Sequence, residues 1–325
     1  MSSVFSTNFA GRNFSIKTNY VAAQADGSTL VYYGDTVVLV TAVSLKSVRE
    51  GVDFLPLTVD YQEMTFAAGK FPGGFFKREG RPNEREILTS RIIDRALRPL
   101  FPKGYYSETQ MVATLLSVDK ENDPDVAAMI GASAALEISD IPFKGPIAGV
   151  RVGRINGELV ANASAEAMKE SEMSLFLVGR KVLPKTSGRA YDVELVMMEG
   201  EAKEVPEEII VEAIQFGLEA IRPVIDLQDQ MRQAVGLAKR SVEEEKPDEE
   251  LIARVRQEAL PGLTEGYGMP RKLERYGKLG EVRDAVVKSV GGEDAMLRKK
   301  VAAMIEQMES RSEERRVGKE CRSWW

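Results

Sequence analysis

The chain has 325 residues and a formal net charge of −6, with 43% hydrophobic and 29% charged residues, which is typical of a two-domain globular protein and not of a disordered one. It contains no histidine and a single cysteine, Cys321, so Ser–His and Cys–His mechanisms and the usual zinc sites are excluded. No apolar run approaches the ~20 residues of a membrane span, and the N-terminus lacks the apolar core of a signal peptide. We therefore expect a cytoplasmic protein that makes no membrane contact.

The first part of the chain, over about 200 residues, is rich in predicted strands. Apolar runs of strand length predict strands at 36–45, 54–63, 110–119, 173–180 and 190–199. Segment 149–162 predicts a hairpin, because Asn156 and Gly157 stand between two strand-like runs and suit a two-residue turn.

Two helices are predicted within this strand-rich part, at 83–101 and 125–139. Asn83 and Glu86 form the pattern of a capping box at the start of the first helix, and Pro99 predicts its end. The second helix is rich in Ala and Gly, which favours close packing against a sheet.

From Pro206 onward the sequence predicts helices only. The expected helical pieces are 206–221, with Pro206 at its first position and an interruption at Pro223, then a continuation from 222 to 245, and 248–259, 272–289 and 293–310. Strands followed by helices predict an α+β domain followed by a separate, small all-α domain. We place these domains at 1–225 and 226–311, with the boundary near 220–245 and a linker candidate at 243–250.

The last residues, 312–325, differ in composition from the rest of the chain. They hold Cys321 and both tryptophans, Trp324 and Trp325. We interpret this segment as a non-native tail, such as a cloning scar, with a disordered native tail as the alternative. Under both interpretations we assign no function to this segment.

The stretch between the second predicted strand and the first helix reads KFPGGFFKREGRP, residues 70–82. Glycines before Phe75 and Phe76 allow the two rings to project from a turn, and Lys77, Arg78 and Arg81 follow directly. Exposed rings that stack on bases, beside cations that hold phosphates, are what binding of single-stranded nucleic acid requires. Within 70–103 there are nine basic and four acidic residues, although the chain as a whole is acidic.

The first helix places Arg91, Arg95 and Arg98 on one face, as secondary RNA or phosphate contacts. Its apolar residues expected to face the core are Ile87, Leu88, Ile92 and Ala96. Two alternatives remain open: adjacent phenylalanines are commonly core anchors, and the arginines could form an ordinary solvated face in which Asp94 pairs with Arg98.

Residues 66–105, FAAGKFPGGFFKREGRPNEREILTSRIIDRALRPLFPKGY, resemble the first RNase PH-type domain of the bacterial polynucleotide phosphorylase family. The resemblance continues into DFLPLTVDYQE before this stretch and NDPDVAAMIGASAALEIS after it, and covers about residues 5–310. It implies an RNase PH-like domain with ribosomal-protein-like βαβ elements, followed by the family's helical domain.

For function, the resemblance implies a homotrimeric ring that degrades mRNA by 3′→5′ phosphorolysis, with polyribonucleotide nucleotidyltransferase activity. Inorganic phosphate is the co-substrate, a nucleoside diphosphate is released, and magnesium is required. It also implies contacts with RNA-degradation machinery, namely a helicase and an endoribonuclease. In the family, the residues matching Phe75, Phe76, Lys77, Arg78 and Arg81 line the central aperture and contact RNA.

The resemblance assigns catalysis and magnesium to a second RNase PH-like domain that this sequence does not contain, so we expect no catalytic and no metal-binding residue here. We call that second domain the active copy and the domain present here the first copy. Where the active copy has a phosphate-binding Gly-Ser-Ser-Ser segment, this chain has Asn122, Asp123, Pro124 and Asp125. Two carboxylates repel phosphate, and proline offers no amide. The active copy's lysine position matches Phe176, near the carboxylates Glu166, Glu170 and Glu172.

The sequence thus predicts the N-terminal, RNA-binding and scaffolding portion of a phosphorolytic exoribonuclease that has no activity of its own. The alternatives are a stand-alone, non-catalytic RNA-binding ring subunit, and catalysis by the first copy itself.

Overall fold

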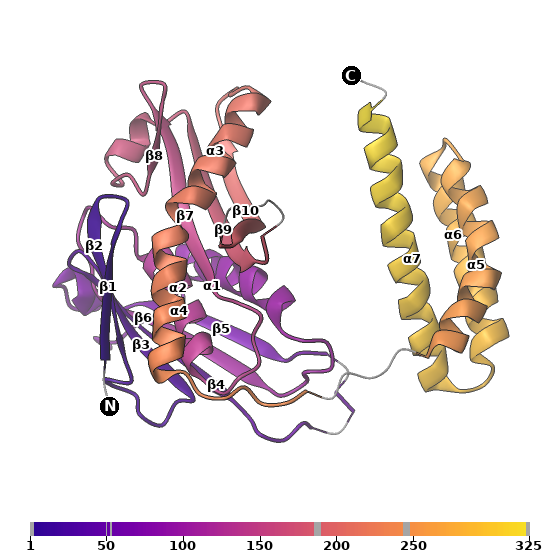
Figure 1. Cartoon of the computed structure of the whole chain (residues 1–325), viewed down its shortest axis with the longest axis horizontal. Helices are drawn as coiled ribbons and strands as arrows, with labels where there is room; N and C mark the ends of the chain where they lie inside the picture. The colour runs from indigo at the N-terminus through magenta and orange to yellow at the C-terminus, as the bar shows by residue number, and fades with distance from the viewer. Residues whose placement is uncertain (1–2, 50, 53, 185–189, 243–247, 323–325) are drawn as a thin grey trace. The chain divides into compact units, whose positions relative to one another are not determined.

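The computed structural model describes residues 3–49, 51–52, 54–184, 190–242 and 248–322, the last of these by backbone alone beyond residue 309 (Figure 1). The chain divides into two compact units, Met1–Glu244 and Glu245–Trp325. The first unit contains sheets and helices and the second contains helices, which confirms the predicted α+β class.

The first sheet has six strands in the order β1-β2-β3-β4-β6-β5. Neighbours are antiparallel except β5 and β6, which are parallel and connected through α1 (Glu84–Leu97). The strands are β1 (Ser3–Phe9), β2 (Arg12–Thr18), β3 (Gly27–Tyr33), β4 (Thr36–Ser44), β5 (Leu57–Glu63) and β6 (Thr109–Ser117). The sequence predicted β4, β5 and β6 but not the first three strands.

The second sheet has four antiparallel strands in the order β10-β9-β7-β8. They are β7 (Ile147–Ile155), β8 (Glu158–Ala161), β9 (Met173–Val182) and β10 (Asp192–Ala202). Ile155 pairs with Glu158 across the turn, where Asn156 and Gly157 have φ values of 52° and 83°. The predicted two-residue hairpin is therefore confirmed, because both turn residues adopt the left-handed conformation that Asn and Gly tolerate best.

Helix α2 (Pro124–Ile138) is buried along its whole length and packs against β3 and β4 of one sheet and β7 of the other (Figure 1). Its Gly131 is required at this contact, because a Cβ there would lie 2.7 Å from Val40 and 2.8 Å from Val31. The core of the first unit is therefore built around α2.

Helix α1 begins with the predicted capping box: the Asn83 side chain accepts from the Glu86 N–H, and the Glu86 carboxylate accepts from the Asn83 N–H. Its buried face carries Ile93, Ala96 and Leu97. The prediction that Ile87 and Leu88 face the core is wrong, since these side chains are 50% and 44% exposed. In the first turns of the helix, the buried positions are instead those of Glu86 and Thr89.

Helices α3 (Glu207–Ala220) and α4 (Arg222–Val235) are separated at Ile221, as the proline at 223 predicted. Pro206 takes the N-cap position of α3 instead of the first helical position. The predicted continuation to 245 is wrong, since α4 ends at Val235.

Residues 236–242 pack along the end of α2. There the Leu237 N–H donates to the Ile138 carbonyl (3.0 Å), and Lys239 Nζ donates to the carbonyls of Leu136 (2.6 Å), Ser139 (2.9 Å) and Glu137 (3.2 Å). Since α4 also packs against β1 and α2, it belongs to the first unit, and a domain boundary after residue 225 would fall within this helix.

The second unit consists of α5 (Glu249–Gly268), α6 (Lys272–Gly291) and α7 (Ala295–Arg322) around a small core that includes Val255, Leu263 and Val301. The backbone of α7 runs through 312–322 of the expected tail. Residues 323–325, and 243–247 of the expected linker, lie outside the described residues. None of the helices in the described ranges has the length and apolar character needed to span a bilayer.

Candidate nucleic-acid interface

The loop 70–82, between the short 3-10 helix η1 (Thr65–Ala68) and α1, holds the predicted RNA-binding residues. Phe75 and Phe76 are 93% and 82% exposed, with their ring centroids 5.5 Å apart and their planes at 84°. Gly74 (φ 77°) and Lys77 (φ 50°) turn the backbone on either side of the ring pair. The alternative that these phenylalanines are core anchors does not agree with this structure, because neither ring packs into the core.

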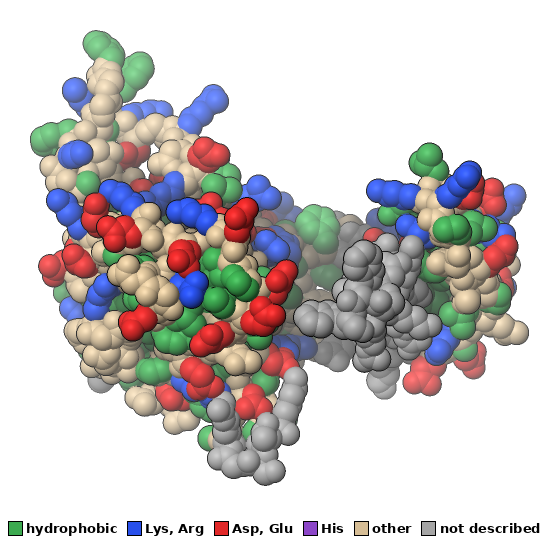
Figure 2. Space-filling view, turned by 90° about the horizontal axis from the view of Figure 1, so that it is seen from above, with side chains coloured by type: hydrophobic (Ala, Val, Ile, Leu, Met, Phe, Trp, Pro, Cys, Tyr) green, Lys and Arg blue, Asp and Glu red, His purple; other side chains and the backbone are tan. Residues whose placement is uncertain are grey.

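The three cations of the loop, Lys77, Arg78 and Arg81, are also exposed. None of them forms an ion pair or a side-chain hydrogen bond with any residue in the described part of the chain. An exposed guanidinium or ammonium without an internal partner keeps its charge available for a polyanion. On the face of the first unit in Figure 2, by contrast, acidic and basic side chains are interspersed.

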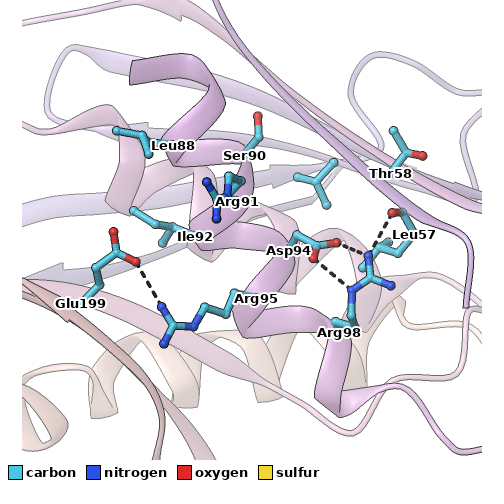
Figure 3. Close-up of a pocket in the computed structure, with 11 residues that line it drawn as sticks. Leu57, Thr58, Leu88, Ser90, Arg91, Ile92, Asp94, Arg95, Arg98 and Glu199 are labelled. Carbon is cyan, nitrogen blue, oxygen red and sulfur yellow. Dashed lines mark hydrogen bonds and ion pairs between the residues drawn. The ribbon is translucent and has the colours of Figure 1, made fainter. Parts of the chain in front are cut away.

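Arg91 and Arg95 of α1, and Arg98 directly after it, line a cavity of about 640 Å³ between α1, β5 and β10 (Figure 3). Arg98 donates to Asp94 (2.6 and 3.0 Å) and to the backbone carbonyls of Leu55 (3.0 Å) and Leu57 (3.1 Å). Arg95 pairs with Glu199 of β10 at 3.3 Å. The predicted Asp94–Arg98 pair is therefore present, and Arg98 is occupied within the fold.

Arg91 is exposed in the same cavity and has no partner among the described residues. Of the three arginines that the sequence treats as equivalent, Arg91 alone has an unpaired charge, Arg95 has one exposed ion pair, and Arg98 is fully engaged. Exposed ion pairs contribute little and exchange readily, so Arg95 can still reach a ligand.

A second cavity, of about 1090 Å³, opens at the start of α2 and is lined by Arg85, Asp123, Asp125 and Arg151. Arg85 binds Asp123 (2.7 Å), and Arg151 of β7 lies 3.3 Å from Asp123 and forms a short ion pair with Asp125. Burial, followed by the nearby Asp123 carboxylate, raises the pKa of Asp125 to about 6, against the opposing effect of Arg151.

These ion pairs occupy the place where a helix start would hold an anion. Asp123 stands at the N-cap of α2, yet its side chain makes no capping hydrogen bond, since it pairs with the two arginines instead. Pro124 follows as the first helical residue and has no N–H. The start of α2 therefore offers two carboxylates to a phosphate, and both nearby guanidinium groups are already engaged.

Phe176, at the position where the resemblance implies a lysine, is 2% exposed and lies under the Arg151 guanidinium at 5.3 Å. Glu166 pairs with Lys169, and Glu172 pairs with Arg154 (2.6 Å each). Within the residues that the structure describes, no three acidic or thiol side chains gather in a way that could hold a metal ion.

Comparison with known proteins identifies two family models on this chain. The 3′ exoribonuclease family, domain 1, matches residues 10–142, and domain 2 of the same family matches residues 145–220. Together these matches cover most of the first unit.

Among curated proteins, the chain is 63% identical over 311 residues to a polyribonucleotide nucleotidyltransferase from Syntrophus aciditrophicus (strain SB), covering 96% of this chain and 44% of the relative. It is 48% identical over 274 residues to the protein of that name from Geobacter sulfurreducens, covering 84% of this chain and 38% of the relative. The chain thus spans less than half the length of these relatives.

Among solved structures, rice (Oryza sativa) Rrp46 superposes with a TM-score of 0.53 at 19% identity, covering 68% of this chain and 94% of that one. At this identity the likeness concerns the fold alone.

Proposed function

Since this chain belongs to the 3′ exoribonuclease family and corresponds to less than half of its polyribonucleotide nucleotidyltransferase relatives, we propose that it is the N-terminal portion of a 3′→5′ phosphorolytic exoribonuclease. In this reaction, inorganic phosphate attacks the terminal phosphodiester of RNA and releases a nucleoside diphosphate. Within this enzyme, the portion described here binds single-stranded RNA and forms the scaffold of a homotrimer. The setting is mRNA degradation in the cytoplasm, together with a helicase and an endoribonuclease.

One observation carries this proposal: an exposed pair of rings, Phe75 and Phe76, stands beside three cations that have no partner among the described residues. Stacking on a ring contributes ~1–3 kcal/mol per base and accepts any base, while the cations hold the phosphates. A trimer brings three such loops to one axis, where their contributions combine. A chain with a net charge of −6 can therefore still bind RNA, because its cations are concentrated at one site.

The catalytic groups and the magnesium ion belong, in this proposal, to a part of the relatives that this chain does not span. The start of α2 supports this assignment, because the half-buried Asp123 and the buried Asp125 are held in ion pairs where a phosphate would have to bind. No step of phosphorolysis is assigned to a residue of this chain.

Binding of a fluorescein-labelled single-stranded RNA to the purified chain, followed by fluorescence anisotropy, tests the proposal. We expect saturable binding that weakens with salt, and much weaker binding of the matched duplex, since paired bases cannot stack on the rings. Equal affinity for strand and duplex would contradict the stacking role. The alternative of a stand-alone ring subunit is tested by sequencing the gene downstream of this segment. A reading frame that continues into a second RNase PH-like domain would exclude that alternative.

A further inference from the structure

The two ends of the loop 70–82 meet at one residue, Thr65. The Lys70 N–H donates to the Thr65 carbonyl at 3.3 Å. From the other end of the loop, the Glu79 carboxylate accepts from the Thr65 N–H at 2.8 Å and from its hydroxyl at 2.7 Å. The contacts between Thr65 and the Glu79 carboxylate, which we call the Thr65–Glu79 clamp, close the segment that carries both rings.

Glu79 is the one side chain between 70 and 82 that hydrogen-bonds to a residue elsewhere in the described part of the chain. Thr65, the residue that Glu79 binds, is itself connected to the sheet. Thr65 begins η1, whose Ala67 carbonyl accepts from the Val118 N–H next to β6 at 3.3 Å. The loop thus has a fixed base at Thr65 and a projecting tip at Phe75 and Phe76.

The clamp also has an electrostatic consequence. Glu79 lies between Arg78 and Arg81 along the chain and is the acid closest to them in sequence. Both of its oxygens face Thr65 donors, and it pairs with neither arginine. Hydrogen bonds from Thr65 lower the pKa of Glu79, so the carboxylate stays ionised and keeps accepting at neutral pH.

We propose that Glu79 is a positioning residue: by binding Thr65 it holds the loop in the arrangement that presents Phe75, Phe76 and the three cations to RNA as one surface. This inference rests on the proposed function. A loop closed at its base samples fewer conformations than one attached only by its ends. It therefore loses less conformational entropy when RNA binds.

The test compares Glu79→Ala and Thr65→Val with Thr65→Ser, which keeps the hydroxyl and serves as the matched control. If the released loop holds the binding arrangement about one tenth of the time, the Kd for single-stranded RNA rises about tenfold in Glu79→Ala. Thr65→Val, which keeps the N–H but loses the hydroxyl, weakens binding less, and Thr65→Ser binds like the parent chain. If Glu79 acted through its charge alone, Glu79→Ala would bind RNA more tightly, because a negative charge beside the cations is gone.

Trypsin cleavage after Lys77 and Arg78 without RNA provides a second readout, whereas the bond after Arg81 precedes Pro82 and resists trypsin. Thr65→Val leaves the loop sequence unchanged, so faster cleavage with an unchanged thermal midpoint reports release of the clamp. Tighter RNA binding by Glu79→Ala, or unchanged cleavage of Thr65→Val, overturns the inference. If the parent chain itself does not bind RNA, the proposed function fails, and the cleavage rates alone decide whether the clamp holds the loop.

Discussion

Replacing Arg78 by alanine tests the loop as a phosphate-binding element. Arg78 is exposed and has no partner among the described residues, so its removal should change the free energy of unfolding by less than about 0.5 kcal/mol. Each phosphate neutralised on a single strand contributes about −0.7 to the slope of log K against log salt concentration. If Lys77, Arg78 and Arg81 each hold one phosphate, the loop contributes a slope of about −2, and Arg78→Ala lowers its magnitude to about 1.4.

The same arithmetic gives the affinity change to be measured. Raising salt from about 50 to 200 mM weakens binding by roughly 20-fold through three contacts and roughly 7-fold through two. Anisotropy titrations of a labelled single-stranded RNA at several salt concentrations give both slopes. Lys103→Ala, which removes an exposed cation outside the loop, is the matched control and should leave the slope unchanged. An unchanged slope in Arg78→Ala would refute the assignment of Arg78 to a phosphate.

Three further predictions concern the rings, the α2 cavity and catalysis. Phe76→Ala should weaken RNA binding by ~1–3 kcal/mol, or roughly 5- to 150-fold in Kd, while the salt slope stays constant; a changed slope would contradict stacking. Arg151→Met should lower the free energy of unfolding by about 3–5 kcal/mol at neutral pH, because it leaves Asp125 buried without its partner. Burial raises the pKa of Asp125 to about 6 with Arg151 present, and removal of this cation raises the pKa further. In the variant, protonation of Asp125 therefore removes the unpaired charge as the pH falls, so denaturant titrations of Arg151→Met should show a smaller loss at pH 5 than at pH 7.5. An equal loss would show that Asp125 is not the cause. The chain alone, incubated with RNA, phosphate and magnesium, should release no nucleoside diphosphate, and release detected by chromatography would mean that the first copy is catalytic.

Much of the fold could be predicted because its signals are local. The capping box of Asn83 and Glu86 and the Asn156–Gly157 turn are set by residues next to each other in sequence, and both are present. The prediction lacks β1 and β2 because polar residues separate their few apolar ones, so neither strand has the continuous apolar run that identifies β4. It also lacks β3, although Leu30 to Tyr33 form such a run. The face of α1 was misjudged at Ile87 and Leu88, since the sheet contact that selects the buried face involves residues far away in the chain.

The sequence by itself determined the chemistry available to this protein: without histidine it has cations, carboxylates and rings, and it places the rings and three cations together in one short loop. Only the tertiary structure decided which charges are unpaired. Arg98 is engaged by the carbonyls of Leu55 and Leu57 at the start of β5, and Asp125 by Arg151 of β7. Arg78 is exposed, and the neighbouring Glu79 binds Thr65. The physical reason is that turns and caps depend on neighbours a few residues apart, whereas ion pairs depend on which distant strands and helices pack side by side.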